Sequence, residues 1–192
     1  NAACKKKHRH KHKKVCERRV AELHDEELFK EPPPPEECPI CLLPLSNDEK
    51  QEVFQVCCGK RICSGCCYAM AIQGGKHLCA FCRIPASRQD EEIIKQTKNL
   101  MDKGIGDAFY IFASYYAQGI YGLQQDYQKT NELLLKAGEL GCAKGYNKLG
   151  NAYSFGRGVE RDAKQAKYYW ELAAMGGYVD ARHNLGCVEF KA

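Results

Sequence analysis

The stretch that decides the fold of this chain reads Cys38-Pro-Ile-Cys41, Cys57-Cys58, Cys63-Ser-Gly-Cys66 and Cys79-Ala-Phe-Cys82. Two cysteines in C-x2-C spacing can bind one zinc ion through sulfurs about 2.3 Å away without straining the chain. Three such pairs and one adjacent pair supply eight thiolates, which is enough for two tetrahedral zinc sites. We therefore expect a compact metal-binding module in this stretch.

The composition sets the broad class of the protein. Its 192 residues are 44% hydrophobic, which suits one or two domains. No apolar run approaches the length of a membrane span, and the basic start has no apolar core of a signal peptide behind it. A secreted disulfide scaffold is the alternative reading of 13 cysteines, but their concentration in one segment favours metal binding in a reducing compartment, cytoplasmic or nuclear. A start without Met and an end inside a repeat suggest a fragment.

The first 19 residues carry a net charge of +8, whereas the rest of the chain carries −3. Such a basic run can bind phosphates or serve as a nuclear address. Within it, Cys4, His12 and Cys16 have the spacing C-x7-H-x3-C, with His12 and Cys16 one helical turn apart. This resembles the C-terminal half of a MYND zinc finger over residues 1–16. The resemblance implies that Cys4 is a ligand of one zinc ion and that His12 and Cys16 are ligands of a second. Most of the other ligands of a MYND finger are absent here, so we expect this half-finger to hold no metal.

A short helix and a linker are expected over residues 17–35. Val20, Leu23 and Leu28 have the spacing of an amphipathic helix. The four prolines from Pro32 to Pro35 cannot continue a helix, and they form a stiff extended spacer; a proline-ligand motif is the alternative.

Residues 36–86, with the cysteine order given above, resemble a RING finger. The resemblance implies a small α+β cross-brace domain in which the first and third pairs share one zinc ion and the second and fourth share another. Carried over, the first site consists of Cys38, Cys41, Cys63 and Cys66. The second site consists of Cys57, Cys58, Cys79 and Cys82. Metal ties the two halves together, so that a domain of this size can fold around a small core.

One position departs from the usual RING pattern. Lys60 stands where the family often has a histidine ligand, and a protonated lysine cannot bind metal. An all-cysteine variant requires both Cys57 and Cys58 to bind, with Cys67 or His77 as possible substitutes. The plainer reading of Cys67 is a small buried apolar residue.

The resemblance also implies an activity. RING domains dock a ubiquitin-charged conjugating enzyme and promote transfer of ubiquitin to a substrate lysine, with no covalent intermediate of their own. The docking residues would be Ile40, Met70 and Arg83, with Arg83 as the residue that bridges enzyme and ubiquitin. Met70 replaces a frequent tryptophan and Ala80 a common proline, and Ile40 and Arg83 also fit purely structural roles.

The second half of the chain repeats itself. Gly122, Asp126, Ala137, Gly141 and Leu149-Gly150 recur 36 residues later, at Gly158, Asp162, Ala173, Gly177 and Leu185-Gly186. A period in the mid-thirties with two helical stretches per unit indicates an all-α solenoid. The pattern resembles Sel-one-like repeats, relatives of the tetratricopeptide class, in two near-complete units and a truncated third over residues 106–192.

Several expectations follow for this half. Residues 87–105 should form a linker with a capping helix over residues 90–103. Cys142 and Cys187 should be small core residues. Leu185, Val188 and Phe190 should lack a covering neighbour. Most of the repeat aromatics should be core between helices rather than contact residues: Tyr110, Tyr115, Tyr116, Tyr121, Tyr153, Tyr168, Tyr169 and Trp170.

The sequence thus predicts a RING-type ubiquitin ligase whose helical repeats recruit protein partners. The alternative is a non-catalytic zinc-binding adaptor. Residues 36–60 lack a basic-aromatic stripe, which disfavours nucleic-acid binding. The sequence shows no phosphate loop, no nucleophile with a base and no open metal site, so an enzyme with its own active site has no support in the pattern.

Overall fold

A computed structural model describes residues 9–46, 51–72 and 78–189. The chain divides into two compact units, Asn1–Glu31 and Pro32–Ala192. In the described ranges no helix is both long enough and apolar enough to cross a membrane.

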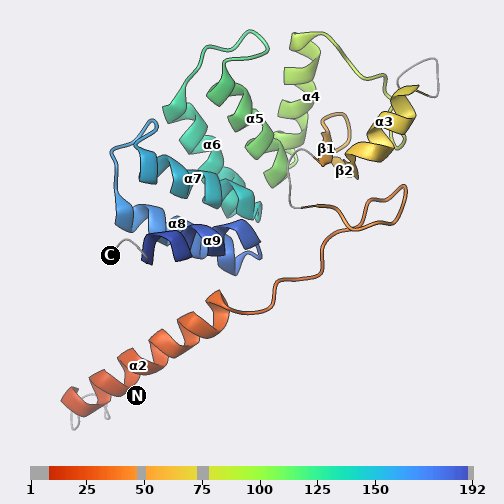
Figure 1. The fold of residues 1–192 in the computed structure, drawn as a ribbon. Coiled ribbons are helices and arrows are strands. Elements are labelled where there is room, and N and C mark those ends of the chain that lie inside the picture. Colours follow the sequence, from red (N-terminus) through yellow and green to blue (C-terminus); the bar gives the residue numbers. More distant parts are fainter. Residues whose placement is uncertain (1–8, 47–50, 73–77, 190–192) are drawn as a thin grey trace. The chain divides into compact units, whose positions relative to one another are not determined.

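In the first unit, residues 9–31 are described and contain the helix α2 (Arg9–Leu28), which begins well before the predicted start at residue 17 (Figure 1). Ion pairs one turn apart support it, including the 2.9 Å contact between Arg18 Nε and Glu22 Oε1. Val20 and Leu23 are exposed, whereas Leu28 is buried. The predicted helix exists, but most of its apolar side chains face solvent.

The cysteine-rich stretch forms a small module with a two-stranded sheet and one helix. Strands β1 (Glu52–Gln55) and β2 (Lys60–Cys63) are antiparallel, and helix α3 (Ser64–Ile72) follows β2 directly. A small cluster of buried residues, Cys38, Leu45 and Ile62, forms the core of this module. So small a core cannot offset the entropy of ordering the whole module, and an additional source of stability is required.

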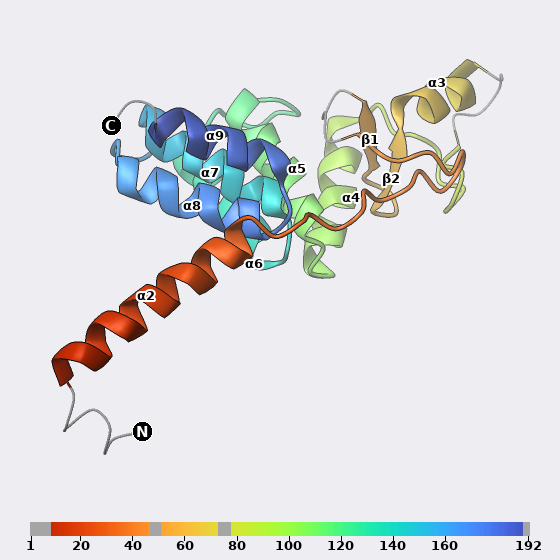
Figure 2. The same ribbon diagram turned by 60° about the horizontal axis from the view of Figure 1, so that its bottom comes forward.

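The rest of the second unit is helical. Its helices are α4 (Asp90–Asp102), α5 (Gly106–Gln118), α6 (Tyr127–Glu139), α7 (Ala143–Phe155), α8 (Ala163–Met175) and α9 (Val179–Glu189). Each packs against the next along the chain, as Figures 1 and 2 show for α5 to α9. The helix predicted over residues 90–103 is confirmed as α4, where Thr97 and Leu100 are buried.

The sequence repeat determines where the helices begin and end. Asp126 and Asp162 cap the N-termini of α6 and α8 with side chains that accept main-chain N–H groups of the first turn. Gly119 and Gly156 end α5 and α7 in the left-handed conformation, with φ of 66° and 71°. The solenoid predicted from the period is therefore confirmed.

Equivalent positions of the two sequence repeats are also buried. Leu134 and its counterpart Trp170 are core residues, as are Ala137 and Ala173. Gly150 in α7 lets the Trp170 ring approach closely, and Trp170 Nε1 donates to Asn151 Oδ1 at 3.0 Å.

The aromatic prediction is largely confirmed. Trp170 and Tyr115 are buried, and the other predicted core aromatics pack partly buried in or against the helical core, with Tyr168 as the exception at 52% exposure.

Two expectations about single residues are wrong. Leu185 is buried at 9% exposure, although it was expected to lack a cover; the side chain of Val188 and residue Phe190 lie outside the described parts. Cys142 is core as predicted, but Cys187 is exposed, with its sulfur 3.6 Å from His183 Nε2. Cys142 Sγ in turn donates to Asp107 Oδ1, and burial raises its pKa to about 12.

Ion pairs join the cysteine-rich module to the helical repeats. Glu52 of β1 pairs with Lys144 of α7, and both side chains are only about a tenth exposed. Arg61 of β2 contacts Asp107 of α5 at 3.1 Å and Glu52 at 3.8 Å. A well-paired, partly buried network of this kind fixes the relative position of the elements that carry it.

We expect Glu52→Gln to lower the free energy of unfolding by about 2–4 kcal/mol, because it leaves the Lys144 ammonium buried beside a neutral amide. Glu139→Gln makes the same change in the exposed pair with Lys136 and should have no measurable effect. Urea unfolding measures both variants. Equal stability of the two would show that the buried pair contributes nothing.

A second prediction concerns equivalent glycines of successive repeats. Gly150→Ala should lower the free energy of unfolding by about 1–3 kcal/mol, because the new Cβ would lie 2.6 Å from Cδ1 of Trp170. Gly186→Ala should raise it by up to about 1 kcal/mol, because nothing lies within 4 Å and alanine favours the helix. Thermal and urea unfolding measure whether the two substitutions change the free energy of unfolding in opposite directions. Destabilisation by both variants would contradict this packing argument.

Candidate metal centres

Eight cysteine sulfurs gather into two groups of four. The first group is Cys38, Cys41, Cys63 and Cys66. The second is Cys57, Cys58, Cys79 and Cys82. Within each group all sulfurs lie within 4.8 Å of one another. The groups interleave along the chain, since each combines cysteines from two separated pairs.

The distances suit a tetrahedral metal site. Cys41 Sγ lies 3.8 Å from Cys63 Sγ, and Cys58 Sγ lies 3.7 Å from Cys79 Sγ. Four zinc–sulfur bonds of about 2.3 Å in a tetrahedron place the sulfurs about 3.8 Å apart. The two sulfurs of a disulfide are only about 2.05 Å apart, so these cysteines are not joined in disulfides. The residues present therefore fit an ion such as Zn²⁺, which strongly favours thiolate ligands.

Two matching loops hold the first and last pairs of cysteines. In residues 38–44 the main chain of Cys38 accepts from Leu42 N and donates to Leu43 O. In residues 79–85 Cys79 makes the same two bonds with Arg83 and Ile84. Each loop closes with a bridge to proline, Glu37 with Pro44 and Leu78 with Pro85. The loops have equivalent hydrogen bonding although only Cys, Cys and Pro are shared at matching positions.

The residue after the second cysteine of each loop adopts the left-handed conformation, with φ of 60° at both Leu42 and Arg83. A non-glycine residue there costs free energy, so the surrounding hydrogen bonds must hold it. Main-chain groups of Ile40 and Cys41 hydrogen-bond to the Cys38 sulfur, and those of Phe81 and Cys82 to the Cys79 sulfur. The equivalence of the two loops was not predicted, although the paired spacing Cys-x2-Cys-x2-Pro was present in the sequence.

In each group one thiol ionises more readily than a free cysteine. Burial opposes ionisation of Cys38, but main-chain N–H groups, first that of Cys63 at 3.4 Å, lower its pKa to about 6. Burial also opposes ionisation of Cys79, and main-chain N–H groups of its loop lower that pKa to about 7. These two thiols are ready to act as thiolate ligands near neutral pH.

Three further thiols, Cys57, Cys58 and Cys66, ionise less readily than a free cysteine. The pKa of Cys66 is raised to about 12, first through its hydrogen bond with the Cys63 sulfur. Burial and the sulfur of Cys82 raise the pKa of Cys57 further, and burial raises that of Cys58. Four thiolates so close together repel one another unless a divalent cation neutralises them. The clusters therefore have the electrostatics of sites that need a bound cation.

The structure separates the predicted ligands from the predicted substitutes. Cys57 and Cys58 both belong to the second group, whereas Cys67 is in neither group and packs partly buried beside the small core. This partly buried position is compatible with the plainer reading of Cys67 as a small apolar residue. His77 lies outside the described residues, and Lys60 is exposed.

The three predicted docking residues have different environments. Ile40 is 41% exposed and Arg83 is exposed, whereas Met70 is partly buried and packs toward Cys38, Leu45 and Ile62. Other apolar residues of the two loops are also exposed and were not predicted. These are Leu42, Leu43, Phe81 and Ile84.

Of the predicted half-finger, His12 and Cys16 lie one turn apart in α2, and Cys16 is exposed. Cys4 is outside the described residues. The only groups of three or more potential ligands in the described parts are the two cysteine groups.

We expect the purified protein to contain two zinc ions per chain. Cys63→Ala should reduce this content by about one ion, because it removes a ligand of the first group only. Cys67→Ala removes a neighbouring cysteine outside both groups and should leave two ions bound. Elemental analysis with a thiol count measures the stoichiometry. Zinc loss from Cys67→Ala, or none from Cys63→Ala, would contradict this assignment.

Comparison with known proteins identifies the helical half. The sequence model of the Sel1 repeat family matches residues 109–142 and 143–178. These ranges coincide with the pairs α5–α6 and α7–α8.

Three solved structures show partial similarity. A Sel1 repeat protein from Oxalobacter formigenes is 29% identical, with a TM-score of 0.47 over 50% of this chain and 38% of that one. Helicobacter pylori cysteine rich protein B is 25% identical, with a TM-score of 0.47 over 50% of this chain and 71% of that one. A protective antigen of uropathogenic Escherichia coli with an SLR fold is 24% identical, with a TM-score of 0.48 over 66% of this chain and 25% of that one.

The matched region spans well under half the length of the Oxalobacter protein. The two repeat units predicted from the 36-residue offset are Sel1 repeats by this match.

Proposed function

We propose that this protein is a RING-type ubiquitin ligase in which the Sel1 repeats recruit protein partners. In this proposal a RING domain over residues 36–86 follows a MYND remnant (1–16) and a linker (17–35). A second linker (87–105) leads to the repeats (106–192). The setting would be the cytoplasm or the nucleus, where thiolate zinc sites persist.

The observation that carries the proposal is the interleaving of the two cysteine groups. The first and third pairs of cysteines lie together, and so do the second and fourth. This is the ligand order that a RING cross-brace requires. The first group would hold one zinc ion and the second group the other, and both ions would have a structural role.

The exposed side chains of the two matching loops support a docking role. Ile40, Leu42 and Leu43 of the first loop are exposed apolar residues, and Phe81 and Ile84 expose apolar surface on the second. Exposed apolar residues on a small, rigid loop suit contact with another protein. Arg83 stands directly after the last cysteine and is exposed, with a planar guanidinium that can donate to two carbonyl surfaces at once.

The chemistry needs no nucleophile from this chain. A substrate lysine amine would attack the thioester carbonyl of ubiquitin carried by the conjugating enzyme. The carbon–sulfur bond breaks, an isopeptide bond forms, and the thiol remains on the conjugating enzyme. This chain would supply proximity and orientation, through Ile40 and its neighbours for docking and Arg83 for fixing ubiquitin.

A non-catalytic adaptor is the alternative function, and one observation favours it. Met70, a predicted docking residue, packs partly buried toward the small core instead of lying fully on the surface. Together with Ala80 in place of a common proline, this leaves a weaker docking groove than many RING domains have.

The deciding experiment is discharge of ubiquitin from a panel of charged conjugating enzymes by the zinc-loaded chain. We expect accelerated discharge to lysine, reduced about tenfold or more by Ile40→Ala and by Arg83→Ala, since each removes contacts worth roughly 1.4 kcal/mol or more. Arg161→Ala removes an exposed arginine of the repeats and should leave the rate unchanged.

Zinc content and thermal unfolding of each variant serve as folding controls. A folded, zinc-loaded chain that accelerates discharge from no enzyme of the panel would exclude the ligase and favour the adaptor. Equal loss of rate in Arg83→Ala and Arg161→Ala would exclude the specific role of Arg83.

A further inference from the structure

We infer that a groove between α5, α6 and α7 binds an extended acidic segment of a partner protein. The groove has a volume of about 330 Å³. Its polar lining includes Ser114, Asn131, Lys148, Asn151 and Arg157. This inference rests on the proposed recruiting role of the repeats and names the kind of partner.

The charge of the groove gives the first argument. Lys148 of α7 and Arg157, just beyond its end, are the charged residues of the lining, which includes no aspartate or glutamate. Two cations in one concave surface raise the local concentration of anionic groups. A segment with carboxylate side chains is therefore favoured over a neutral or basic one.

Hydrogen bonds hold the groove in shape before a partner arrives. Asn131, which is buried, donates through Nδ2 to the main-chain oxygen of Arg157 at 2.8 Å and ties α6 to the loop after α7. The guanidinium of Arg157 lies 5.5 Å from the centre of the Phe155 ring, which restricts its rotamers. A preformed site loses less conformational entropy on binding.

The donors of the groove point to an acceptor-rich ligand. Asn151 Oδ1 accepts from Trp170, and the amide nitrogen of Asn151 carries two N–H groups that can donate to a ligand. The hydroxyls of Ser114 and Thr130 donate to main-chain oxygens of their own helices. Lysine, arginine and an amide donor suit carboxylates and main-chain carbonyls, the acceptors of an extended peptide.

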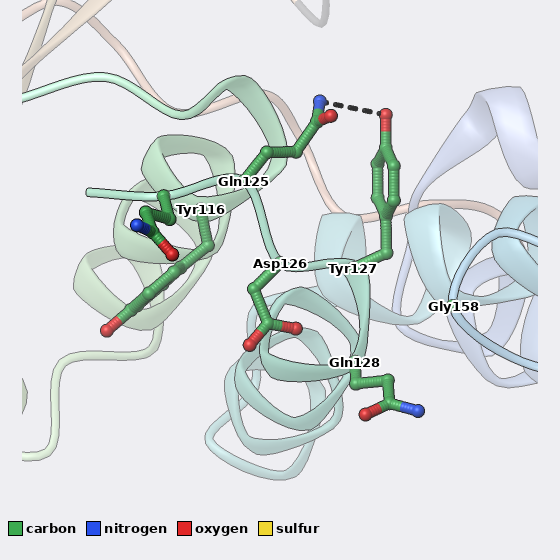
Figure 3. Close-up of a pocket in the computed structure, with 7 residues that line it drawn as sticks. Tyr116, Gln125, Asp126, Tyr127, Gln128 and Gly158 are labelled. Carbon is green, nitrogen blue, oxygen red and sulfur yellow. Dashed lines mark hydrogen bonds between the residues drawn. The ribbon is translucent and has the colours of Figure 1, made fainter.

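Tyr127 lines the groove and also a neighbouring depression. Figure 3 shows its hydroxyl bonded to the side chain of Gln125, at 3.1 Å. In that depression the carboxylate of Asp126 caps α6 by accepting from Lys129 N. This carboxylate keeps its negative charge while it caps the helix, and it lines the depression but not the groove.

The size of the groove limits the occupant. A volume near the lower end of about 300–1,000 Å³, the range of small-ligand sites, accommodates a few side chains and no folded domain. An extended segment that presents one or two acidic side chains fits both the size and the charge.

The test is fluorescence anisotropy with three labelled eight-residue peptides that alternate leucine with glutamate, glutamine or lysine. The full chain should bind the glutamate peptide at least about tenfold more tightly than the other two. Raising the salt from about 0.05 M to about 0.5 M should weaken this binding, because ions screen exposed charges.

Matched variants locate the site. Lys148→Gln with Arg157→Gln should weaken binding of the glutamate peptide about tenfold or more. The control variant, Lys103→Gln with Lys164→Gln, removes two exposed cations outside the groove. It should change the affinity for the glutamate peptide little. Lys148→Glu with Arg157→Glu should reverse the preference to the lysine peptide, which an unfolded chain cannot do.

Equal binding of the glutamate and glutamine peptides, no binding of the glutamate peptide by the folded chain, or equal losses in the two glutamine variants would overturn the inference. The assay contains no conjugating enzyme, so its result is independent of ligase activity. Ubiquitin discharge without peptide selectivity would overturn the acidic-segment inference alone. Peptide selectivity without discharge would support the groove and favour the adaptor.

Discussion

The fold of the cysteine-rich module depends on how four sulfurs can share one small space. Apart from the thiol groups, its core of buried residues is little more than Leu45 and Ile62, which cannot offset the entropy of ordering about 45 residues. The main chain nevertheless brings eight sulfurs into two clusters, where mutual repulsion of thiolates would be destabilising without a cation. A divalent metal turns that repulsion into attraction, so the feature that weakens the bare chain would stabilise the loaded one.

The same strand that leads into one metal group also carries the junction with the repeats. β2 ends at Cys63, and two residues earlier Arg61 contacts Asp107 of α5. Across the sheet, Glu52 pairs directly with Cys63 in register and reaches Lys144 of α7 with its side chain. Any change that disorders the first metal group would therefore also disturb the ion pairs that hold the module to the repeats. Binding of a metal ion at the first group would therefore be energetically linked to the junction through one short sheet.

Sequence reasoning succeeded where local chemistry recurs at a fixed spacing. Asp126 and Asp162 cap helices at the predicted period, and the pairs of cysteines collect as the RING resemblance implied. It failed where tertiary packing determines the contacts and the burial of a side chain. The pair Glu52–Lys144 joins residues far apart with no local signal, and Met70 turns toward a core that the sequence alone does not define. Cys187 lies on the exposed side of the last helix, which its apolar character did not indicate.

Ion pairs at the junction bear directly on how a recruiting scaffold would assist ubiquitin transfer. A flexible linker between a docking module and a recruiting groove spreads the substrate over many positions, so few of its lysines lie near the thioester at any moment. Here Arg61 and Glu52 fix the module against α5 and α7, and α7 also supplies Lys148 to the groove. A segment bound in the groove would therefore be held within a restricted distance of the cysteine-rich module. Such a restriction raises the effective concentration of nearby lysines and narrows the set of lysines that can react.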